Sequence, residues 1–197
     1  MVTTYPIALH LAGRACLVVG SNEEAADRAR SLSDAGAKVE VVSERPELAL
    51  SVVINERSLL HHRRPFAASD LDGKWLAVLT DRDFELGRAM AASAKARHVL
   101  FCATDQPQDN TYSHMAQTRA GVITVAISTN GRAPSLGRRL REELARVFLE
   151  ARLAPFADQL AALREQTPPE QRREVLGKAV TEVRFEGRLR LPITPLR

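Results

Sequence analysis

An apolar run that stops abruptly at a glycine constrains the fold of this 197-residue chain more than any other feature. The run covers residues 15–19, it stops at Gly20, and a helix-forming segment begins three residues later at Glu23. A strand, a tight turn and a helix in this order are typical of the first βαβ unit of a parallel α/β sheet. The first amides of such a helix point beyond the carboxyl end of the strand, where they and the helix dipole favour an anion.

The turn departs from the dinucleotide-binding pattern G-x-G-x-x-G/A at its middle position. It reads Gly20-Ser21-Asn22-Glu23-Glu24-Ala25, so the first glycine and the small last residue are present. Asparagine tolerates positive φ, and we therefore expect the turn to form with the Asn22 side chain in the space where a cofactor would approach. Glu23 and Glu24 suit a helix N-terminus but would repel a diphosphate. The motif alone fits both a bound dinucleotide and an ordinary βα turn.

Strands and helices alternate through the first half of the chain. The pattern predicts strands at 15–19, 38–43, 58–63, 75–80 and 99–103, and helices at 23–35, 46–55 and 83–96. This alternation predicts an α/β fold, a Rossmann-like parallel sheet with helices on both faces.

The second half follows a different pattern. It predicts one strand at 121–128, a long helix from Pro134 to about residue 151, and short helices separated at Pro155 and at the Pro168-Pro169 pair, ending in a tail with Pro192 and Pro195. We therefore divide the chain into a Rossmann-like domain (1–112), a strand-plus-helix segment (113–150) and a small helical C-terminal region with a tail (151–197).

Composition narrows the classes of protein. No apolar run is as long as a membrane span, and the N-terminus shows no secretory signal region, so we expect a cytoplasmic protein that does not bind membranes. Cys16 and Cys102 lie in apolar strands without metal-ligand or redox spacing, which indicates buried thiols. The net charge is +4, and arginines cluster at 132, 138, 139 and 141. These fit a solvated helix face or a polyanionic small molecule, while the scarcity of aromatic residues among them argues against nucleic acid.

Ligands of open α/β sheets bind at the carboxyl ends of the strands. After the second strand, Ser43 or Glu44 is placed to bind an adenosine ribose hydroxyl, which favours NAD, although Arg45 could accommodate a 2′-phosphate. Thr80 and Asp81, after the fourth strand, would face the cofactor from the other side of the crevice. The alternative for Asp81 is that it only caps the next helix.

Two further groups are candidates for chemistry. Asp105 follows the fifth strand, where its carboxylate either enters the cleft to accept a proton or touch a metal ion, or bonds to the amides of its own turn. The second group follows the strand at 121–128, where hydroxyls, amides and an arginine could form an anion cradle or simply cap the long helix: Ser128, Thr129, Asn130, Gly131 and Arg132.

Five blocks, in order over about residues 5–150, resemble the siroheme synthase N-terminal module family, which comprises precorrin-2 dehydrogenases and sirohydrochlorin ferrochelatases. The blocks are the turn at 18–29 (family V-V-G-G-G-x-V-A-x-R-K-A), Leu32 with 35–37 (L-L-x-A-G-A), 79–81 (A-T-D), 102–107 (N-V-x-D-x-P) and 126–141 (I-S-T-x-G-x-S-P-x-L-A-R-x-L-R). The last block is the most specific. Asn22 and Ala133 depart from the family pattern.

The resemblance implies an NAD-dependent oxidoreductase that converts precorrin-2 to sirohydrochlorin in siroheme (porphyrin-type) biosynthesis. Some members also insert ferrous iron, a lyase activity. The essential carboxylate of the family, proposed to act in dehydrogenation and in chelation, matches Asp105, which is therefore also a candidate metal contact, although the sequence leaves the metal ligands unknown. The family forms an intertwined homodimer, which gives 113–150 a dimerisation role, and the eight carboxylates of the tetrapyrrole suit an arginine-rich wall. Because of Asn22, the alternative is a tetrapyrrole chelatase or binding protein that has lost NAD-dependent activity.

Overall fold

The computed structural model describes residues 4–187 and 189–191. It divides into two compact units, residues 1–114 and 115–197, which are described separately below. Our division at residues 112 and 150 stays a prediction. The expected tail residues Pro192 and Pro195 lie outside the described residues.

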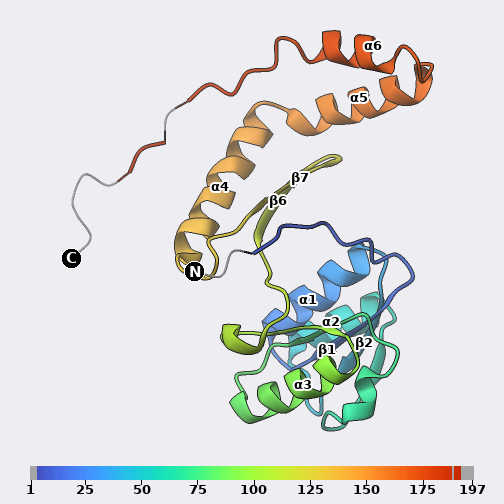
Figure 1. The fold of residues 1–197 in the computed structure, drawn as a ribbon, viewed down its shortest axis with the longest axis vertical. Coiled ribbons are helices and arrows are strands. Elements are labelled where there is room, and N and C mark those ends of the chain that lie inside the picture. Colours follow the sequence, from blue (N-terminus) through green and yellow to red (C-terminus); the bar gives the residue numbers. More distant parts are fainter. Residues whose placement is uncertain (1–3, 188, 192–197) are drawn as a thin grey trace. The chain divides into compact units, whose positions relative to one another are not determined.

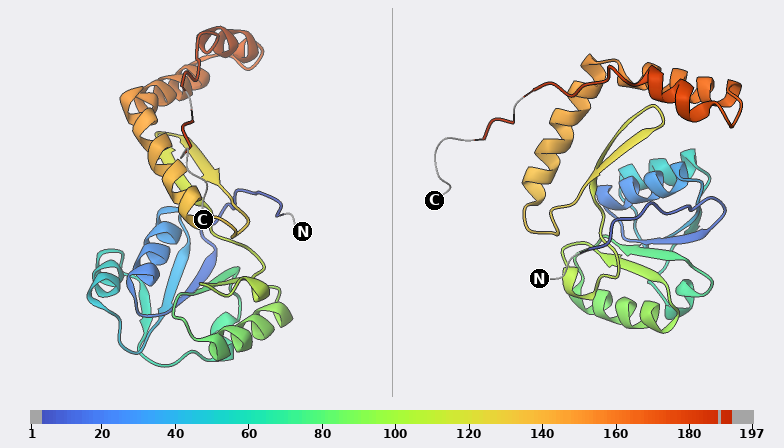
Figure 2. Two further views of the ribbon diagram at one scale, coloured as in Figure 1. Left: turned by 90° about the vertical axis from the view of Figure 1, so that its left-hand side faces the viewer. Right: turned by 45° about the horizontal axis from the view of Figure 1, so that its top comes forward.

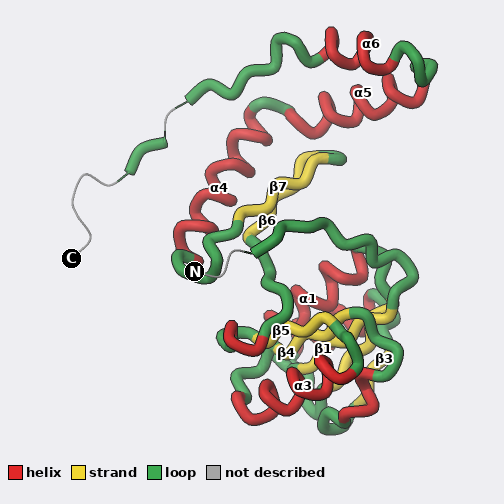
Figure 3. Tube along the Cα trace, viewed as in Figure 1, coloured by secondary structure: helices red, strands yellow, loops and turns green. Residues whose placement is uncertain are grey.

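The first unit is built on a five-stranded parallel sheet (Figures 1 and 3). Its order is β3-β2-β1-β4-β5, with β1 at Ala15–Val19, β2 at Lys38–Val42, β3 at Leu60–His62, β4 at Leu76–Leu79 and β5 at Leu100–Ala103. The order reverses direction at β1, and ligands of doubly wound sheets bind at this switch point. The predicted α/β class is confirmed.

Helices cover both faces of the sheet (Figure 2). The helices α1 (Glu23–Asp34) and α2 (Leu48–Glu56) pack on one face, where the buried side chains of β1 and β2 include Cys16, Val18 and Val41. The helix α3 (Phe84–Ala96) and the short 3₁₀ turn η1 (Ala68–Leu71) cover the other face. Strands buried on both faces explain the continuous apolar runs of the sequence.

Asn22 differs from our expectation. Its φ is −90°, not positive, and its side-chain oxygen accepts a hydrogen bond from the Ala25 amide at 3.0 Å. Asn22 is thus the N-cap of α1, a position at which asparagine is strongly favoured. The positive φ of the turn falls instead on Gly20, at +143°.

The second unit begins with an antiparallel hairpin, β6 (Ala116–Ala120) and β7 (Ile123–Ile127). Our prediction of a single strand here was wrong, because β6 reads Ala-Gln-Thr-Arg-Ala and has no apolar run. The long helix α4 (Pro134–Glu150) packs against β6. Among the described residues, no helix is long and apolar enough to cross a membrane.

Two shorter helices complete the second unit, α5 (Leu153–Gln166) and α6 (Arg172–Ala179). Pro155 lies within the first turn of α5 and not between helices, which corrects our expectation, because proline is tolerated at a helix start. The break falls at Arg152, whose φ is +50°. Pro168 and Pro169 do separate α5 from α6.

Candidate functional site

A cleft of about 590 Å³ opens at the carboxyl edge of the parallel sheet. This volume is within the usual range of small-molecule sites. Its walls are formed by the ends of β1 and β2, the loops that follow β1, β2, β3 and β4, and the start of α3: Val19, Gly20, Ser21, Val42, Ser43, Glu44, Arg45, Arg64, Pro65, Phe66, Asp81, Asp83 and Leu86. The cleft therefore lies at the switch point that the sheet order defines.

Gly20 is required at the floor of this edge. A Cβ at Gly20 would lie 2.0 Å from Oγ1 of Thr80 and 3.0 Å from Oδ1 of Asp81. The loop after β1 thus packs directly onto the end of β4. Thr80 is only 1% exposed, and its hydroxyl donates to the carbonyl of Val19. The side chain therefore does not face the cleft, contrary to the predicted contact with a cofactor.

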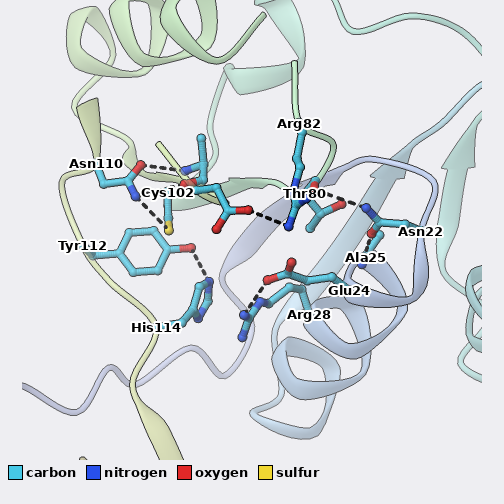
Figure 4. A network of polar contacts seen from close by, with 12 residues as sticks. Asn22, Glu24, Ala25, Arg28, Thr80, Arg82, Cys102, Asn110, Tyr112 and His114 are labelled. Carbon is cyan, nitrogen blue, oxygen red and sulfur yellow. Dashed lines mark hydrogen bonds and ion pairs between the residues drawn. The ribbon is translucent and has the colours of Figure 1, made fainter. Parts of the chain in front are cut away.

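Two amides at the turn into α1, those of Ser21 and Ala25, already have side-chain partners within the protein. Asp81 Oδ1 accepts a hydrogen bond from the Ser21 amide at 3.0 Å, and Asn22 uses the Ala25 amide. The Asn22 side-chain amide also donates to the carbonyl oxygen of Thr80 at 3.2 Å (Figure 4). A diphosphate at this helix would therefore share or replace these contacts. Of the glutamates, Glu24 is paired with Arg28 at 2.7 Å, which offsets its charge.

The wall formed by the end of β2 combines a buried hydroxyl and a cation. Ser43 is 6% exposed, and its Oγ has no hydrogen-bond partner. Glu44 and Arg45 are exposed and line the same cleft. A buried hydroxyl without a partner is costly, so the wall offers an unsatisfied polar atom at the position that binds ribose in doubly wound folds.

The wall formed by the end of β3 was missed by our sequence analysis. Arg64 binds Asp70 in a two-pronged ion pair, with Nη1 2.9 Å from Oδ2. The hydrogen bonds from this guanidinium outweigh burial, which acts in the opposite direction, and hold the pKa of Asp70 below its ordinary value. Phe66 and Leu86 add apolar surface. The signal that could have found Arg64 and Phe66 is their place directly after a predicted strand of the same sheet.

Asp105 lies on a strained turn after β5. Its φ is +60°, unusual for a residue other than glycine, and its carboxylate lies 2.8 Å from Nη2 of Arg82. Both side chains are exposed, at 55% and 76%. Among the described residues, no amide of its own turn donates a hydrogen bond to this carboxylate. Strain that the surrounding structure maintains is common at functional sites.

Two neighbouring side chains hold this turn in place. Gln106 is 1% exposed, and its side-chain amide donates to the Asp83 carbonyl at 3.2 Å. Asn110 accepts from the Ala103 amide at 2.7 Å and donates to the Ala103 carbonyl at 3.1 Å. The backbone on both sides of Asp105 is therefore fixed.

Tyr112 and His114 form a pair of polar side chains near the end of β5 (Figure 4). The Tyr112 hydroxyl lies 3.3 Å from Nε2 of His114, and the rings meet edge to face. Desolvation, with a contribution from the charge of Arg28, lowers the pKa of His114. The imidazole is thus neutral at pH 7.

The predicted substrate loop belongs to the second unit. The Ser128 hydroxyl accepts a hydrogen bond from the Asn130 amide at 3.2 Å, and Thr129 Oγ1 accepts one from the Ala133 amide at 3.4 Å. Asn130 and Gly131 both have positive φ. Nearby on α4, Arg139 and Arg146 pair with Glu143, as expected of a solvated helix face. The placement of this loop against a substrate stays a prediction.

The described residues contain no group of three or more histidine, cysteine or acidic side chains that could hold a metal ion. Burial raises the pKa of the Cys16 and Cys102 thiols to about 11, so both are protonated and poor ligands.

The residues of the cleft fit an adenine dinucleotide. Gly20 lets the loop after β1 pack onto the end of β4, the cleft has a suitable volume, and Ser43 presents a hydroxyl without a partner. Five of the predicted cofactor residues line the cleft: Gly20, Ser21, Ser43, Glu44 and Asp81. Four do not: Asn22, Glu23, Glu24 and Thr80.

Comparison with known proteins agrees with this geometry. Residues 7–116 match the family model described as "Putative NAD(P)-binding", which supports NAD as the cofactor, and residues 121–146 match "Sirohaem biosynthesis protein central". A solved structure titled "SirC, precorrin-2 dehydrogenase" shares the fold, with a TM-score of 0.76 and 23% identity over 91% of this chain and 90% of that one.

Curated relatives extend the match to the second unit. The siroheme synthase of Methylobacillus flagellatus is 32% identical over 93% of this chain, and that of Thiobacillus denitrificans is 33% identical over 93%. The chain spans 39% and 40% of the length of these two relatives. The predicted resemblance is confirmed: the chain belongs to the siroheme synthase N-terminal module family.

Proposed function

We propose that this chain catalyses the NAD-dependent dehydrogenation of precorrin-2 to sirohydrochlorin. The observation that carries the proposal is the exposed Asp105 carboxylate, held on a strained turn at the same sheet edge as the cleft. Its partner Arg82 directly follows Asp81, a residue of the cleft wall. The name of the related solved protein and the siroheme synthase relatives support this choice of reaction.

Asp105 serves as the general base in this proposal. Dehydrogenation removes one hydride and one proton from the macrocycle, and NAD, when bound, supplies the hydride acceptor. The Asp105 carboxylate takes the proton, and Arg82 orients that carboxylate. Ser43, Glu44 and Asp81 bind the adenosine half, while the loop at 128–132 and the arginines of the second unit bind substrate carboxylates.

The experiment is anaerobic incubation of the protein with precorrin-2 and NAD, followed by the absorbance of sirohydrochlorin and of NADH. We expect both products in equal amounts. Asp105→Asn should reduce the rate by about a hundredfold or more. The matched control is Asp109→Asn, an acidic residue four positions further on. Full activity of Asp105→Asn would refute the assigned role, and the absence of both products would refute the reaction.

Iron insertion is the second candidate activity, and Asp105 is again the group for it. Ferrous iron would be a substrate, and the carboxylate would accept protons that leave the macrocycle as iron enters. The same variants, assayed with sirohydrochlorin and ferrous iron but no NAD, separate this activity from dehydrogenation. Metal insertion without NAD binding would favour the alternative of a chelatase that has lost its dehydrogenase activity.

We also propose a homodimer formed through the second unit. Val122 and Leu149 are 68% and 79% exposed, and both lie in the segment expected to mediate dimerisation. Light scattering on the purified chain tests this, and the double variant Val122→Ser, Leu149→Ser should shift the chain toward the monomer.

We further propose a cytoplasmic location. It is supported by two buried free thiols, which are usual in reducing compartments.

A further inference from the structure

The residue after β2 decides how a doubly wound fold treats the adenosine ribose. An acidic side chain there binds the ribose hydroxyls of NAD, whereas a nearby arginine accommodates the 2′-phosphate of NADP. Here the first residue after the strand is Ser43, which is small and neutral. Its amide donates to the His62 carbonyl at 3.1 Å, and its carbonyl meets Nε2 of His61 at 2.9 Å, so its backbone is fixed at the cleft wall.

The Ser43 hydroxyl is available to a ligand. Its oxygen is buried and has no hydrogen-bond partner, although the residue lines the cleft. Leaving such a group unpaired costs free energy that a bound acceptor would recover. A serine hydroxyl changes its position by rotation about χ1 between staggered rotamers, so a bound acceptor can draw it out of its buried position.

Arg45 supplies the positive charge. It lines the same cleft, and it has no hydrogen bond or ion pair with any residue that the structure describes. The other cation of the cleft, Arg64, is bound to Asp70 through both terminal nitrogens. A guanidinium that is not committed to a carboxylate is well suited to bind a phosphate.

We propose that Ser43 and Arg45 form a subsite for the adenosine 2′-phosphate, so that the cleft binds NADP in addition to NAD. This inference rests on the proposed nucleotide binding at the same cleft. Glu44 also lines the cleft, and its carboxylate opposes an added phosphate, so the subsite acts against one negative charge.

Calorimetric titration with nucleotide fragments tests the subsite without any catalytic assay. The two probes are 5′-AMP and adenosine 2′,5′-bisphosphate, which differ only in the 2′-phosphate. We expect the bisphosphate to bind about tenfold more tightly at low salt, the effect of one charge-assisted hydrogen bond. Arg45→Ala should abolish this difference and leave 5′-AMP binding unchanged, and Ser43→Ala should reduce it. Glu44→Gln should increase it.

Two controls separate the subsite from general charge attraction. Arg63→Ala removes an exposed arginine that does not line the cleft, and it should leave the ratio of the two affinities unchanged. Adenosine 3′,5′-bisphosphate has the charge of the 2′,5′ isomer but should not show the Arg45-dependent gain. Melting curves of each variant verify folding.

The outcomes distinguish the subsite from the proposed function. Equal affinities for 5′-AMP and the 2′,5′-bisphosphate in the unaltered protein would overturn the subsite while leaving nucleotide binding intact. So would an affinity ratio that Arg45→Ala does not change. If neither 5′-AMP nor the 2′,5′-bisphosphate binds, both the subsite and the NAD-dependent function would be overturned.

Discussion

The guanidinium of Arg82 and the carboxylate of Asp105 form an ion pair of 2.8 Å between the loops that follow β4 and β5. These are neighbouring strands of the sheet, so the pair joins two adjacent loops at its carboxyl edge. Both side chains are largely exposed, and exposed pairs contribute little to stability. The pair is therefore better understood as orienting a reactive group.

Arg82→Ala should separate orientation from stability. The free energy of unfolding should change by less than about 0.5 kcal/mol, because exposed pairs contribute little. The dehydrogenation rate should fall about tenfold or more, because a small misplacement of a catalytic group is costly. Urea unfolding and the precorrin-2 assay measure the two quantities. A large loss of stability with an unchanged rate would show that the pair is structural. The control is Arg88→Ala, which removes an arginine on the exposed face of α3.

Asn22→Gly should tighten NAD binding. The substitution frees the Ala25 amide and removes the side chain that bonds to Thr80. We expect about a tenfold gain in affinity, the value of one hydrogen bond to a charged group.

Asn22→Ala is the comparison for that variant. It loses the helix cap, at a cost of about 1 kcal/mol in stability, which is larger than the cost of glycine at the same position. Weaker NAD binding in the glycine variant would mean that the asparagine side chain itself contacts the cofactor.

Gly87→Ala should destabilise the support of Asp105. A Cβ at Gly87 would lie 2.0 Å from Oε1 of Gln106, and overpacking of this kind costs about 1–3 kcal/mol. In a Gln106→Ala background the same change should be neutral or stabilising by up to about 1 kcal/mol, because alanine favours the helix over glycine. Chemical denaturation of the four proteins of this cycle gives the coupling. Additive effects would show that the two side chains do not meet.

Glu40 should make stability depend on acid pH. Burial alone would raise its pKa, but hydrogen bonds from Lys74 and His62 outweigh burial and hold the pKa below its ordinary 4.5. A pKa that is lowered by folding stabilises the protein above the ordinary value, and this contribution is lost as pH falls through the folded value. Glu40→Gln should therefore be less stable than the unaltered protein at pH 7, and the difference should shrink as pH falls below 4.5 toward pH 3.

Denaturant titrations at both pH values test that difference. Glu56→Gln, an exposed residue at the end of α2, is the control and should show no such dependence. A stability gap that persists unchanged at pH 3 would contradict the role of the Glu40 charge.

The sequence is informative where local chemistry decides the structure. The run at 15–19, the turn at Gly20 and the helix from Glu23 are all present as predicted, because parallel strands buried on both faces leave a strong apolar signal. The hairpin strand β6 was not predicted, since its pairing with β7 is a tertiary contact and Ala-Gln-Thr-Arg-Ala has no large apolar or β-branched aliphatic residue to mark a strand.

Side-chain placement in the site was harder to predict than the fold. The turn pattern predicted where Asn22 lies in the turn but not where its side chain points. The side chain caps α1 by accepting from the Ala25 amide instead of extending into the cleft. Likewise Thr80 follows the strand as expected, yet the close packing of Gly20 covers it. The wall containing Arg64 and Phe66 follows β3, whose three residues give only a weak strand signal.

The β6–β7 hairpin has a consequence for how the second unit reaches its native state. Two antiparallel strands are at best marginally stable in water without further cover, and here α4 supplies that cover to β6. If a second copy completes the cover, folding and assembly become one equilibrium, and the melting temperature should rise with protein concentration.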